Sequence, residues 1–464
     1  MRNLPIKFVL LILISTALGF FSHFNLGLNT HQALSIAIFS VSILGTLFFW
    51  SFRLSFAFLG TAILMMTKTI DLEHLVRFAS LEVILFLVGM MIIIGLLKDE
   101  GFFAWIVSLI LRMRNLSAKK FVLSVTIISA LLACAVDEVT SIIFMVAAIL
   151  EICDYFEVDP LPYIIISVLA TNIGSAATVL GNPIGILIAS KAGLTFEDFI
   201  LKAFPVAMVC LVAVIFLIMF WYRKSFKKLD LHIKELGGND ILIKLISVPV
   251  EKKLKISLLI FGLTLLIISL HHRLELLWNL ELNTVLLVMP LVSSGGIMIW
   301  KKHKAREYVE QDVEWWTLLF FLLLFAQAGT LKYTGATDVL AQKIIGLTGS
   351  NPHILSGAIL WISAIGSSLL DNVVLVAAFI PIIQGFQALQ VNLEPLWWAL
   401  LFGGCFGGNI TVVGSTANIV ALGILEKEKK IHISFFRWFW VGLTVGLITT
   451  CLAWAILVFL PFHR

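Results

Sequence analysis

Long apolar stretches follow one another along the whole chain and are separated by short polar segments. A stretch of about 17–25 apolar residues is long enough to cross the hydrocarbon layer of a bilayer as a helix. The pattern predicts eleven spans, two of which are interrupted by glycine, asparagine, and proline or threonine. The predicted spans are 6–23, 33–50, 54–66, 81–97, 162–190 (interrupted), 203–222, 256–270, 282–300, 314–331, 395–425 (interrupted) and 434–460.

Two further apolar stretches, 120–153 and 353–388, contain acidic residues near their middle. Asp137 and Glu138 interrupt the first, and Asp371 interrupts the second. Each stretch is too long for one crossing, so we expect each to fold as a re-entrant hairpin of two half-length helices. A charge at the centre of a bilayer costs at least about 2.5–3.5 kcal/mol. These carboxylates are therefore expected to face protein or water rather than lipid.

Composition agrees with a chain embedded in a membrane. Of the 464 residues, 60% are hydrophobic and only 13% are charged, whereas soluble domains carry about 25% charged residues. These values exclude an ordinary soluble fold and predict an all-α polytopic membrane protein. The net charge of +5 reflects the loops and gives no reason to expect nucleic-acid binding. We interpret residues 6–22 as a first span, because no small-residue cleavage site stands out after them.

Lys and Arg residues gather in some loops and are absent from others. Residues 223–255 contain nine, 112–120 and 301–306 contain four each, and 426–430 contain three. Segments 24–32, 349–353 and 384–394 contain none. Because cytoplasmic loops carry an excess of Lys and Arg, the first group is predicted to be cytoplasmic. This gives a multi-pass cell-membrane protein with its N-terminus inside, its C-terminus outside and one hairpin open to each side.

The two halves of the sequence repeat. Asp137 and Asp371, at the ends of "ISALLACAVD" and "ISAIGSSLLD", are 371 − 137 = 234 residues apart. "TVLG" (178–181) recurs as "TVVG" (411–414) at 414 − 181 = 233 residues. The loop charges predict that the copies have opposite orientation, as in many secondary transporters. We therefore divide the chain into an N-terminal span (1–30), a first repeat (31–222), a basic cytoplasmic linker (223–255) and a second repeat (256–464).

Four polar breaks, two in each repeat, are predicted to meet near the membrane midplane. Asp137 and Asn182 are placed to cap the helices that follow them, with Pro183 as a first helical residue, and Ser415 is the equivalent cap in the second copy. The polar and glycine positions of the breaks are the candidate substrate- and ion-binding residues: Asp137, Glu138, Thr140, Ser141, Asn172, Gly174, Ser175, Thr178, Gly181, Asn182, Pro183, Ser368, Asp371, Asn372, Gly408, Asn409, Thr411, Gly414, Ser415, Thr416 and Asn418.

These residue types offer two kinds of chemistry. Carboxylates, amide oxygens and unwound carbonyls suit a small cation or a proton, and Asp137, Glu138 and Asp371 form a candidate Na⁺ site. Helix N-termini with Asn, Ser and Thr donors suit an anion. The structural alternatives are that the glycines form a close-packing face and that Ser and Thr only cap helices. The repeated spacing favours a functional interpretation.

At these motifs the chain resembles the ion transporter superfamily that includes arsenite permeases, sodium/proton antiporters of the NhaD type, the melanosomal P protein, and citrate or dicarboxylate carriers. Family patterns near "LDNVTT … NIGGxATLIGDPPN" and "LDNxxxxxxxIP … GGNxTLIGxxAN" correspond here to "VDEVTS … NIGSAATVLGNPIG" and "LDNVVLVAAFIP … GGNITVVGSTAN". The resemblance covers roughly residues 80–200 and 314–440. It implies a scaffold domain, a moving transport domain, a homodimer and elevator-type alternating access.

The resemblance also assigns binding roles, and the chain departs from the pattern at some of these places. The roles fall on Asp137, Thr140, Asn172, Thr178, Pro183, Asp371, Asn372, Asn409, Thr411 and Asn418. Glu138 replaces the usual Asn, Asn182 stands where many members have Asp, and Gly185 stands where Asn is usual. The additional acid favours a cation or proton site.

Two functions remain open at this point. One is a secondary transporter that couples a small carboxylate or oxyanion to Na⁺ or H⁺, and the other is a Na⁺/H⁺ antiporter. A channel or a receptor is the alternative from another class. An enzyme is not expected, because the sequence shows no nucleophile–base pair and no phosphate loop. No cofactor is expected beyond the coupling ion.

Overall fold

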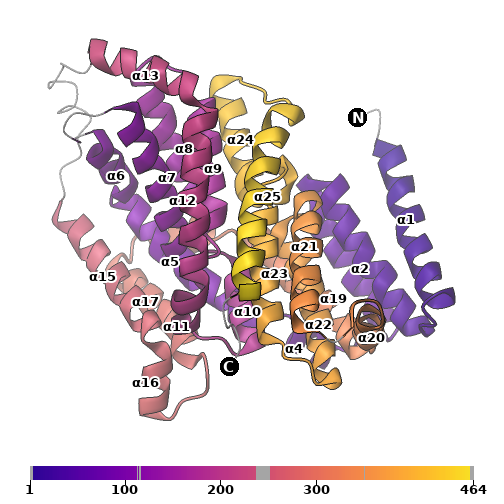
Figure 1. The fold of residues 1–464 in the computed structure, drawn as a ribbon. Coiled ribbons are helices and arrows are strands. Elements are labelled where there is room, and N and C mark those ends of the chain that lie inside the picture. The colour runs from indigo at the N-terminus through magenta and orange to yellow at the C-terminus, as the bar shows by residue number, and fades with distance from the viewer. Residues whose placement is uncertain (1–3, 112, 114–116, 237–250, 350, 460–464) are drawn as a thin grey trace. The chain divides into compact units, whose positions relative to one another are not determined.

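The computed structural model describes residues 4–111, 113, 117–236, 251–349 and 351–459. Within these ranges the chain forms helices and no strands (Figure 1). Eight of the described helices are long and apolar enough to cross a bilayer, or nine if the bent pair α15–α16 is counted as one span. Of the predicted linker 223–255, residues 237–250 lie outside the described residues, and the part before them is α13 (Arg223–Leu236).

Each uninterrupted span that the sequence predicts coincides with a helix to within a few residues, because the apolar runs end at polar or capping positions. These helices are α1 (Leu4–Phe24), α2 (Thr30–Phe48), α3 (Arg53–Met66), α5 (Leu81–Asp99), α12 (Phe204–Trp221), α15 (Lys252–Ser269), α17 (Thr284–Trp300), α19 (Trp315–Tyr333) and α25 (Phe435–Phe459). The connections contain shorter helices that the apolar pattern did not predict: α4 (Leu72–Phe78), α6 (Phe102–Leu111), α11 (Phe196–Asp198), α16 (His271–Trp278), α18 (Ala305–Glu307) and α20 (Ala336–Thr348).

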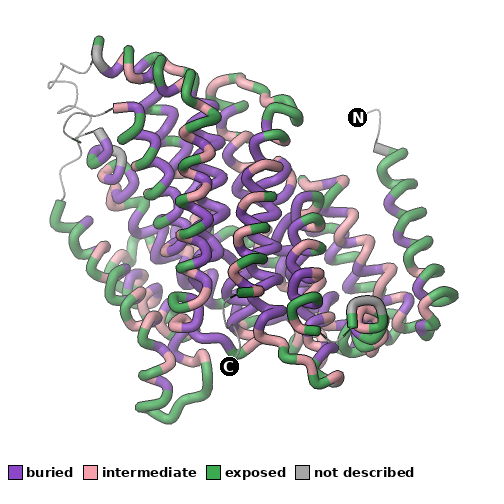
Figure 2. Tube along the Cα trace, in the orientation of Figure 1, coloured by how far each residue is buried: buried purple, intermediate pink, exposed green. Residues whose placement is uncertain are grey.

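Both interrupted spans are broken as predicted. Span 162–190 forms α9 (Leu161–Gly174) and α10 (Pro183–Ala192), and span 395–425 forms α23 (Glu394–Gly407) and α24 (Thr416–Lys429). The first helix of each pair is enclosed by protein, since every residue of α9 and all but the first of α23 are buried (Figure 2). A helix that is apolar on all sides belongs in a core.

The two acidic stretches each form a pair of helices, but these helices are longer than expected. The first pair is α7 (Ala118–Ala135) and α8 (Glu138–Tyr155), and the second is α21 (Pro352–Leu369) and α22 (Asn372–Gly385). Helices α7, α8 and α21 have 18 residues each, which is about 27 Å at 1.5 Å per residue. The prediction of half-length helices was therefore wrong, because the apolar pattern continues without a breaker up to each acidic turn.

The contacts divide the chain into two compact units. Unit 1 consists of Met1–Ile84, Glu314–Gly407 and Trp454–Arg464, and unit 2 consists of Leu85–Val313 and Gly408–Ala453. In unit 1, α1 packs along α2 (Figure 1), α19 contacts α2, α3, α4 and α22, and α21 packs against α23. In unit 2, α9 packs against α7, α8 and α12, and α24 packs against α8 and α9.

The internal repeat is visible as the same close helix contact in both units. A Cβ added to Gly174 of α9 would lie 2.6 Å from the Ala130 Cα of α7, and one added to Gly407 of α23 would lie 2.5 Å from the Ala364 Cα of α21. The paired positions are 364 − 130 = 234 and 407 − 174 = 233 residues apart, as in the sequence repeat. Both contacts are close backbone approaches that only glycine allows.

Loops that the sequence places on one side of the membrane contact one another within each unit. Among the predicted external loops, Tyr333 Oη donates to Asp71 Oδ2 at 3.4 Å in unit 1, and Arg273 Nε lies 2.7 Å from Glu197 Oε1 in unit 2. On the predicted cytoplasmic side, Arg53 Nη2 donates at 3.3 Å to Thr317 Oγ1, which lies near the start of the predicted span 314–331 in unit 1. These contacts agree with the predicted alternation of sides. Which side is cytoplasmic stays a prediction.

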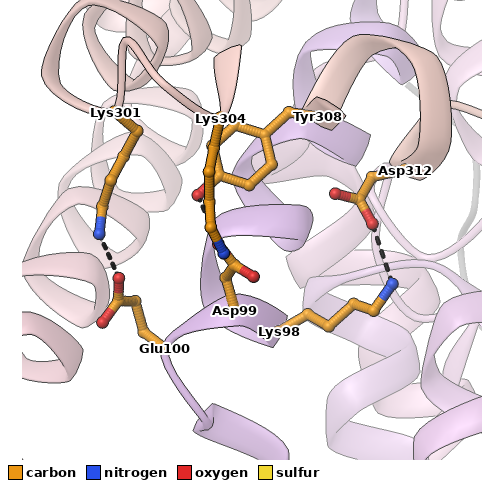
Figure 3. Close-up of polar contacts among 7 residues, drawn as sticks. All are labelled: Lys98, Asp99, Glu100, Lys301, Lys304, Tyr308 and Asp312. Atoms are coloured by element: carbon orange, nitrogen blue, oxygen red, sulfur yellow. Dashed lines mark hydrogen bonds and ion pairs between the residues drawn. The ribbon is translucent and has the colours of Figure 1, made fainter. Parts of the chain in front are cut away.

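An ionic cluster joins the end of α5 to the segment that follows α17 (Figure 3). Its members are Lys98, Asp99, Glu100, Lys301, Lys304, Tyr308 and Asp312. Lys98 Nζ lies 3.0 Å from Asp312 Oδ1, Lys304 Nζ lies 2.7 Å from Asp99 Oδ2, and Lys301 pairs with Glu100. The hydrogen bond to Asp99 raises the pKa of Lys304, and burial together with a hydrogen bond to Asp99 raises the pKa of Tyr308. The cluster therefore fixes the segment that leads into α19.

Candidate ion-binding site

The turn between α7 and α8 places two carboxylates at a helix start. Asp137 is the N-cap of α8, and its Oδ1 accepts a hydrogen bond from the Thr140 N–H at 2.8 Å. Glu138, the first residue of α8, is only 2% exposed. A carboxylate at this end satisfies free N–H groups and lies at the positive end of the helix dipole. The predicted cap is confirmed.

The break between α9 and α10 is held by its own polar side chains. Asn182 caps α10, with its Oδ1 accepting from the Gly185 N–H at 2.9 Å, and its Nδ2 donates to Ser175 Oγ at 3.0 Å. Ser175 Oγ donates to the Asn172 carbonyl at 3.1 Å, and Thr178 Oγ1 donates to the Cys134 carbonyl of α7. The hydroxyls of Ser175 and Thr178 therefore fix the shape of the break.

Glycine and proline allow the chain to take this path. A Cβ on Gly181 would lie 2.7 Å from the Ser175 Cα, so the break folds back on itself only with glycine there. Pro183 begins α10, where its missing N–H is not needed. The Cys134 Sγ also donates to the Gly174 carbonyl at 3.2 Å, which links the hairpin to the end of α9.

The second break, between α23 and α24, is closed by Asn418. Its Nδ2 donates to the carbonyls of Gly408 at 2.7 Å and Thr411 at 2.8 Å. Ser415 caps α24 as predicted, with its Oγ accepting from the Ala417 N–H at 3.2 Å. Gly414 ends the short helix η5 (Val412–Gly414) and Thr416 begins α24.

Five buried side chains from three breaks form one hydrogen-bonded group, which we call the amide cluster: Glu138, Asn172, Asn409, Ser415 and Asn418. Asn172 Nδ2 donates to Asn409 Oδ1 at 2.9 Å and to Asn418 Oδ1 at 2.8 Å. Ser415 Oγ lies within donating distance of Asn172 Oδ1 at 3.1 Å and of Glu138 Oε1 at 3.4 Å. Every member is at most 2% exposed. Residues from both repeats thus meet inside unit 2.

Several polar atoms near the amide cluster are buried without a hydrogen-bond partner among the described residues. They are Asn409 Nδ2, Ser141 Oγ of α8 and Thr171 Oγ1 of α9. A buried polar group that is left unpaired costs about 1–3 kcal/mol, and each such group in a native protein calls for an explanation. A bound solute or water would satisfy these three.

The fourth break belongs to unit 1. Asp371, 3% exposed, caps α22 and accepts from the Val373 N–H at 3.1 Å. Asn372 Oδ1 accepts from the same N–H at 2.9 Å, and Ser368 Oγ donates to the Ile365 carbonyl at 2.6 Å. The other three breaks lie in unit 2. The meeting of all four breaks, and a cation shared by Asp137, Glu138 and Asp371, stay predictions.

Sequence reasoning missed Trp438 as a part of this region. Its Nε1 donates to the Asn409 carbonyl at 3.1 Å, and the side chain is 1% exposed. An aromatic residue in a long apolar span normally indicates contact with lipid or the interface, and no local pattern distinguishes this one.

Comparison with known families decides the class of the protein. The Citrate transporter family (CitMHS) matches residues 46–403. The chain belongs to this family. That match covers both hairpins, the first break, the helices α19 to α22 and most of α23.

Individual relatives agree with the family. An uncharacterized transporter of Mycobacterium tuberculosis is 32% identical over 384 residues, covering 80% of this chain and 84% of the relative. The P protein of Homo sapiens is 26% identical over 447 residues, covering 82% of this chain and 53% of the P protein. The crystal structure of the Alcanivorax borkumensis YdaH transporter covers 85% of this chain at a TM-score of 0.52 and 14% identity. The protein is therefore a multi-pass membrane transporter with a transporter fold.

Proposed function

We propose that this chain is a secondary active transporter that moves a small carboxylate or oxyanion together with Na⁺ or H⁺. The amide cluster carries the proposal. It combines side-chain amides and a hydroxyl with the carboxylate of Glu138, and Asn409 Nδ2 has no partner among the described residues. Such a group can receive an anion on its donors and a cation on its oxygens.

The donors support an anionic substrate. Helices α8 and α24, which pack against each other, both begin at this region, and helix N-termini attract anions. The free donor of Asn409 and the hydroxyls of Ser141 and Thr171 add neutral hydrogen bonds. The description of the family as citrate transporters makes a carboxylate the first substrate to test.

The acids account for coupling. An anion that approaches the buried Glu138 meets a like charge in a region with little water, where electrostatic repulsion is strong. A cation or proton that neutralises Glu138 or Asp137 removes this repulsion. Anion binding is then favourable only after cation binding, which is the thermodynamic condition for co-transport.

We further propose elevator-type alternating access in a homodimer. The repeated α7–α9 and α21–α23 contacts support the internal repeat that such mechanisms use.

A Na⁺/H⁺ antiporter is the second candidate, and the acid at position 138 favours it. Both candidates are tested by flux into proteoliposomes. We expect a Na⁺ or proton gradient to drive uptake of citrate, succinate, phosphate or arsenite, and Asp137→Asn to abolish it. Glu151→Gln, an exposed acid on the same helix α8, is the control and should leave uptake unchanged. Sodium-driven proton movement without any anion would instead establish the antiporter.

A further inference from the structure

Arg53 is a buried charge that the proposed transport site does not use. It is the first residue of α3 in unit 1, and it is 5% exposed. Arginine is almost never fully buried unless it is paired. A guanidinium in this position therefore needs a compensating interaction.

The direct contacts of Arg53 satisfy only a part of its hydrogen-bonding capacity. The guanidinium carbon lies 3.9 Å from the centroid of Trp50 and 5.2 Å from that of Phe320 in α19. Nη2 donates to Thr317 Oγ1 at 3.3 Å, while the buried Nε has no partner among the described residues. Cation–π contacts with two rings fix the plane of the group, but a guanidinium has five N–H donors.

The geometry of α19 and α22 brings Asp371 to the same level as Arg53. These two helices pack together, and Lys332 Nζ donates to Gln384 Oε1 at 3.1 Å near their C-terminal ends. Asp371 lies 384 − 371 = 13 residues before Gln384. The position 13 residues before Lys332 in α19 is 332 − 13 = 319, and it lies at the equivalent height along the helix pair. Because all α-helices rise by the same amount per residue, Asp371 lies level with the turn of α19 that Arg53 contacts.

Electrostatics agree with this placement. The buried Arg53 lies within reach of the fields of two acids, Asp371 and Glu314, the N-cap of α19. Asp371 is itself buried at the start of α22. Two opposite charges that are both buried stabilise each other more than they would in water.

We propose that Arg53 is a built-in counter-charge that neutralises Asp371 while no coupling cation is bound there. This inference rests on the proposed role of Asp371 as a cation-binding residue. Arg53 and Na⁺ then compete for the field of one carboxylate, so the guanidinium sets how tightly the cation binds. Arg53 acts through Asp371 and does not touch the substrate.

The first test is a double-mutant cycle on thermal unfolding in Na⁺-free buffer, with Arg53→Gln, Asp371→Asn and the double variant. We expect Arg53→Gln to lower the unfolding midpoint, because the buried Asp371 loses the field of an opposite charge. Adding Asp371→Asn should restore most of the loss. Glu314→Gln is the matched control, since this acid also acts on Arg53 but lies outside the hairpin. Independent, additive effects of the two substitutions would overturn the proposal.

The second test titrates Na⁺ against the same unfolding midpoint, which a merely structural role would not change. The rise of the unfolding midpoint with Na⁺ should occur at about tenfold lower Na⁺ concentration in Arg53→Gln than in the unmodified protein. The reason is that a charged group close to a carboxylate changes the carboxylate's affinity for a cation by about this factor. Arg53→Lys should respond as the unmodified protein does. If Arg53→Gln responds to Na⁺ as the unmodified protein does while Asp371→Asn responds more weakly, the proposed role of Arg53 is overturned and the cation-binding role of Asp371 stands. An unchanged response in Asp371→Asn would overturn the cation role of Asp371 as well.

Discussion

The repeated glycine contacts allow a prediction with an internal control. Gly174 in α9 and Gly407 in α23 face Ala130 and Ala364 at equivalent places in the two units. We predict that Gly174→Ala and Gly407→Ala each destabilise the protein strongly and to a similar extent. Gly295→Ala in α17 should not, because nothing lies within 4 Å of a Cβ added there.

The geometry sets the size of the effect. The new methyl would lie 2.6 Å from the Ala130 Cα in one copy and 2.5 Å from the Ala364 Cα in the other. The nearest atom to the methyl of Gly174→Ala is the Ala130 carbonyl oxygen at 2.2 Å, and ordinary contact begins at 3.4 Å, so α9 must move away from α7 by about 3.4 − 2.2 = 1.2 Å. Overpacking of a buried contact costs about 1–3 kcal/mol or more. Alanine at an open helical site instead stabilises by about 0.5–1 kcal/mol.

The assay is the thermal unfolding midpoint of purified protein in detergent, followed by monodispersity on gel filtration. The expected order is Gly295→Ala at or above the unmodified protein, with both repeat variants well below it. Equal midpoints for Gly174→Ala and Gly295→Ala would refute the close approach of α9 to α7. A large loss in only one repeat variant would refute the equivalence of the two copies.

Three further predictions follow from individual contacts. Asn172→Ala removes hydrogen bonds to Asn409, Asn418 and Ser415 and should cost about 2–4 kcal/mol; a midpoint like that of the unmodified protein would contradict the amide cluster. Reversing Glu100 to lysine should lower the midpoint and a simultaneous Lys301→Glu should recover it, whereas no recovery would refute the pairing in Figure 3. Hydrogen bonds from the backbone and side chain of His74 hold the pKa of Asp71 below its usual range. Its stabilisation is therefore present above about pH 4 and lost as the pH falls further, so Asp71→Asn should show a smaller midpoint loss on acidification, and an equal loss would contradict this.

Most of the fold was predictable because it depends on local, regular signals. The length of each apolar run sets each uninterrupted span, and the cap residues Asp137, Asn182 and Ser415 start helices where they were expected to. The repeat was visible from Asp137 and Asp371 and from the segments TVLG and TVVG, and the structure adds the equivalent glycine contacts of Gly174 and Gly407.

Other features depend on partners that are distant in sequence. Nothing local indicates that Asn172 bridges Asn409 and Asn418, 237 and 246 residues away. The basic residues Lys301 and Lys304 indicated the side of the membrane, but the sequence does not show that they pair with Glu100 and Asp99. Helix length in the hairpins was misjudged because each acidic turn was expected to lie near the membrane midplane between two short helices. The acidic residue marks the turn but does not set the length of the helices beside it.

The central claim is that the amide cluster binds the transported anion. The most direct measurement is gradient-driven uptake of a labelled anion into proteoliposomes, using the anion that raises the unfolding midpoint most among citrate, succinate, phosphate and arsenite. Asn409→Leu removes the free amide donor, together with the Oδ1 that accepts from Asn172, and keeps the branched shape of the side chain. We predict that this variant loses uptake and the anion-induced rise in midpoint while Na⁺ still stabilises it. Uptake at the rate of the unmodified protein would contradict the claim.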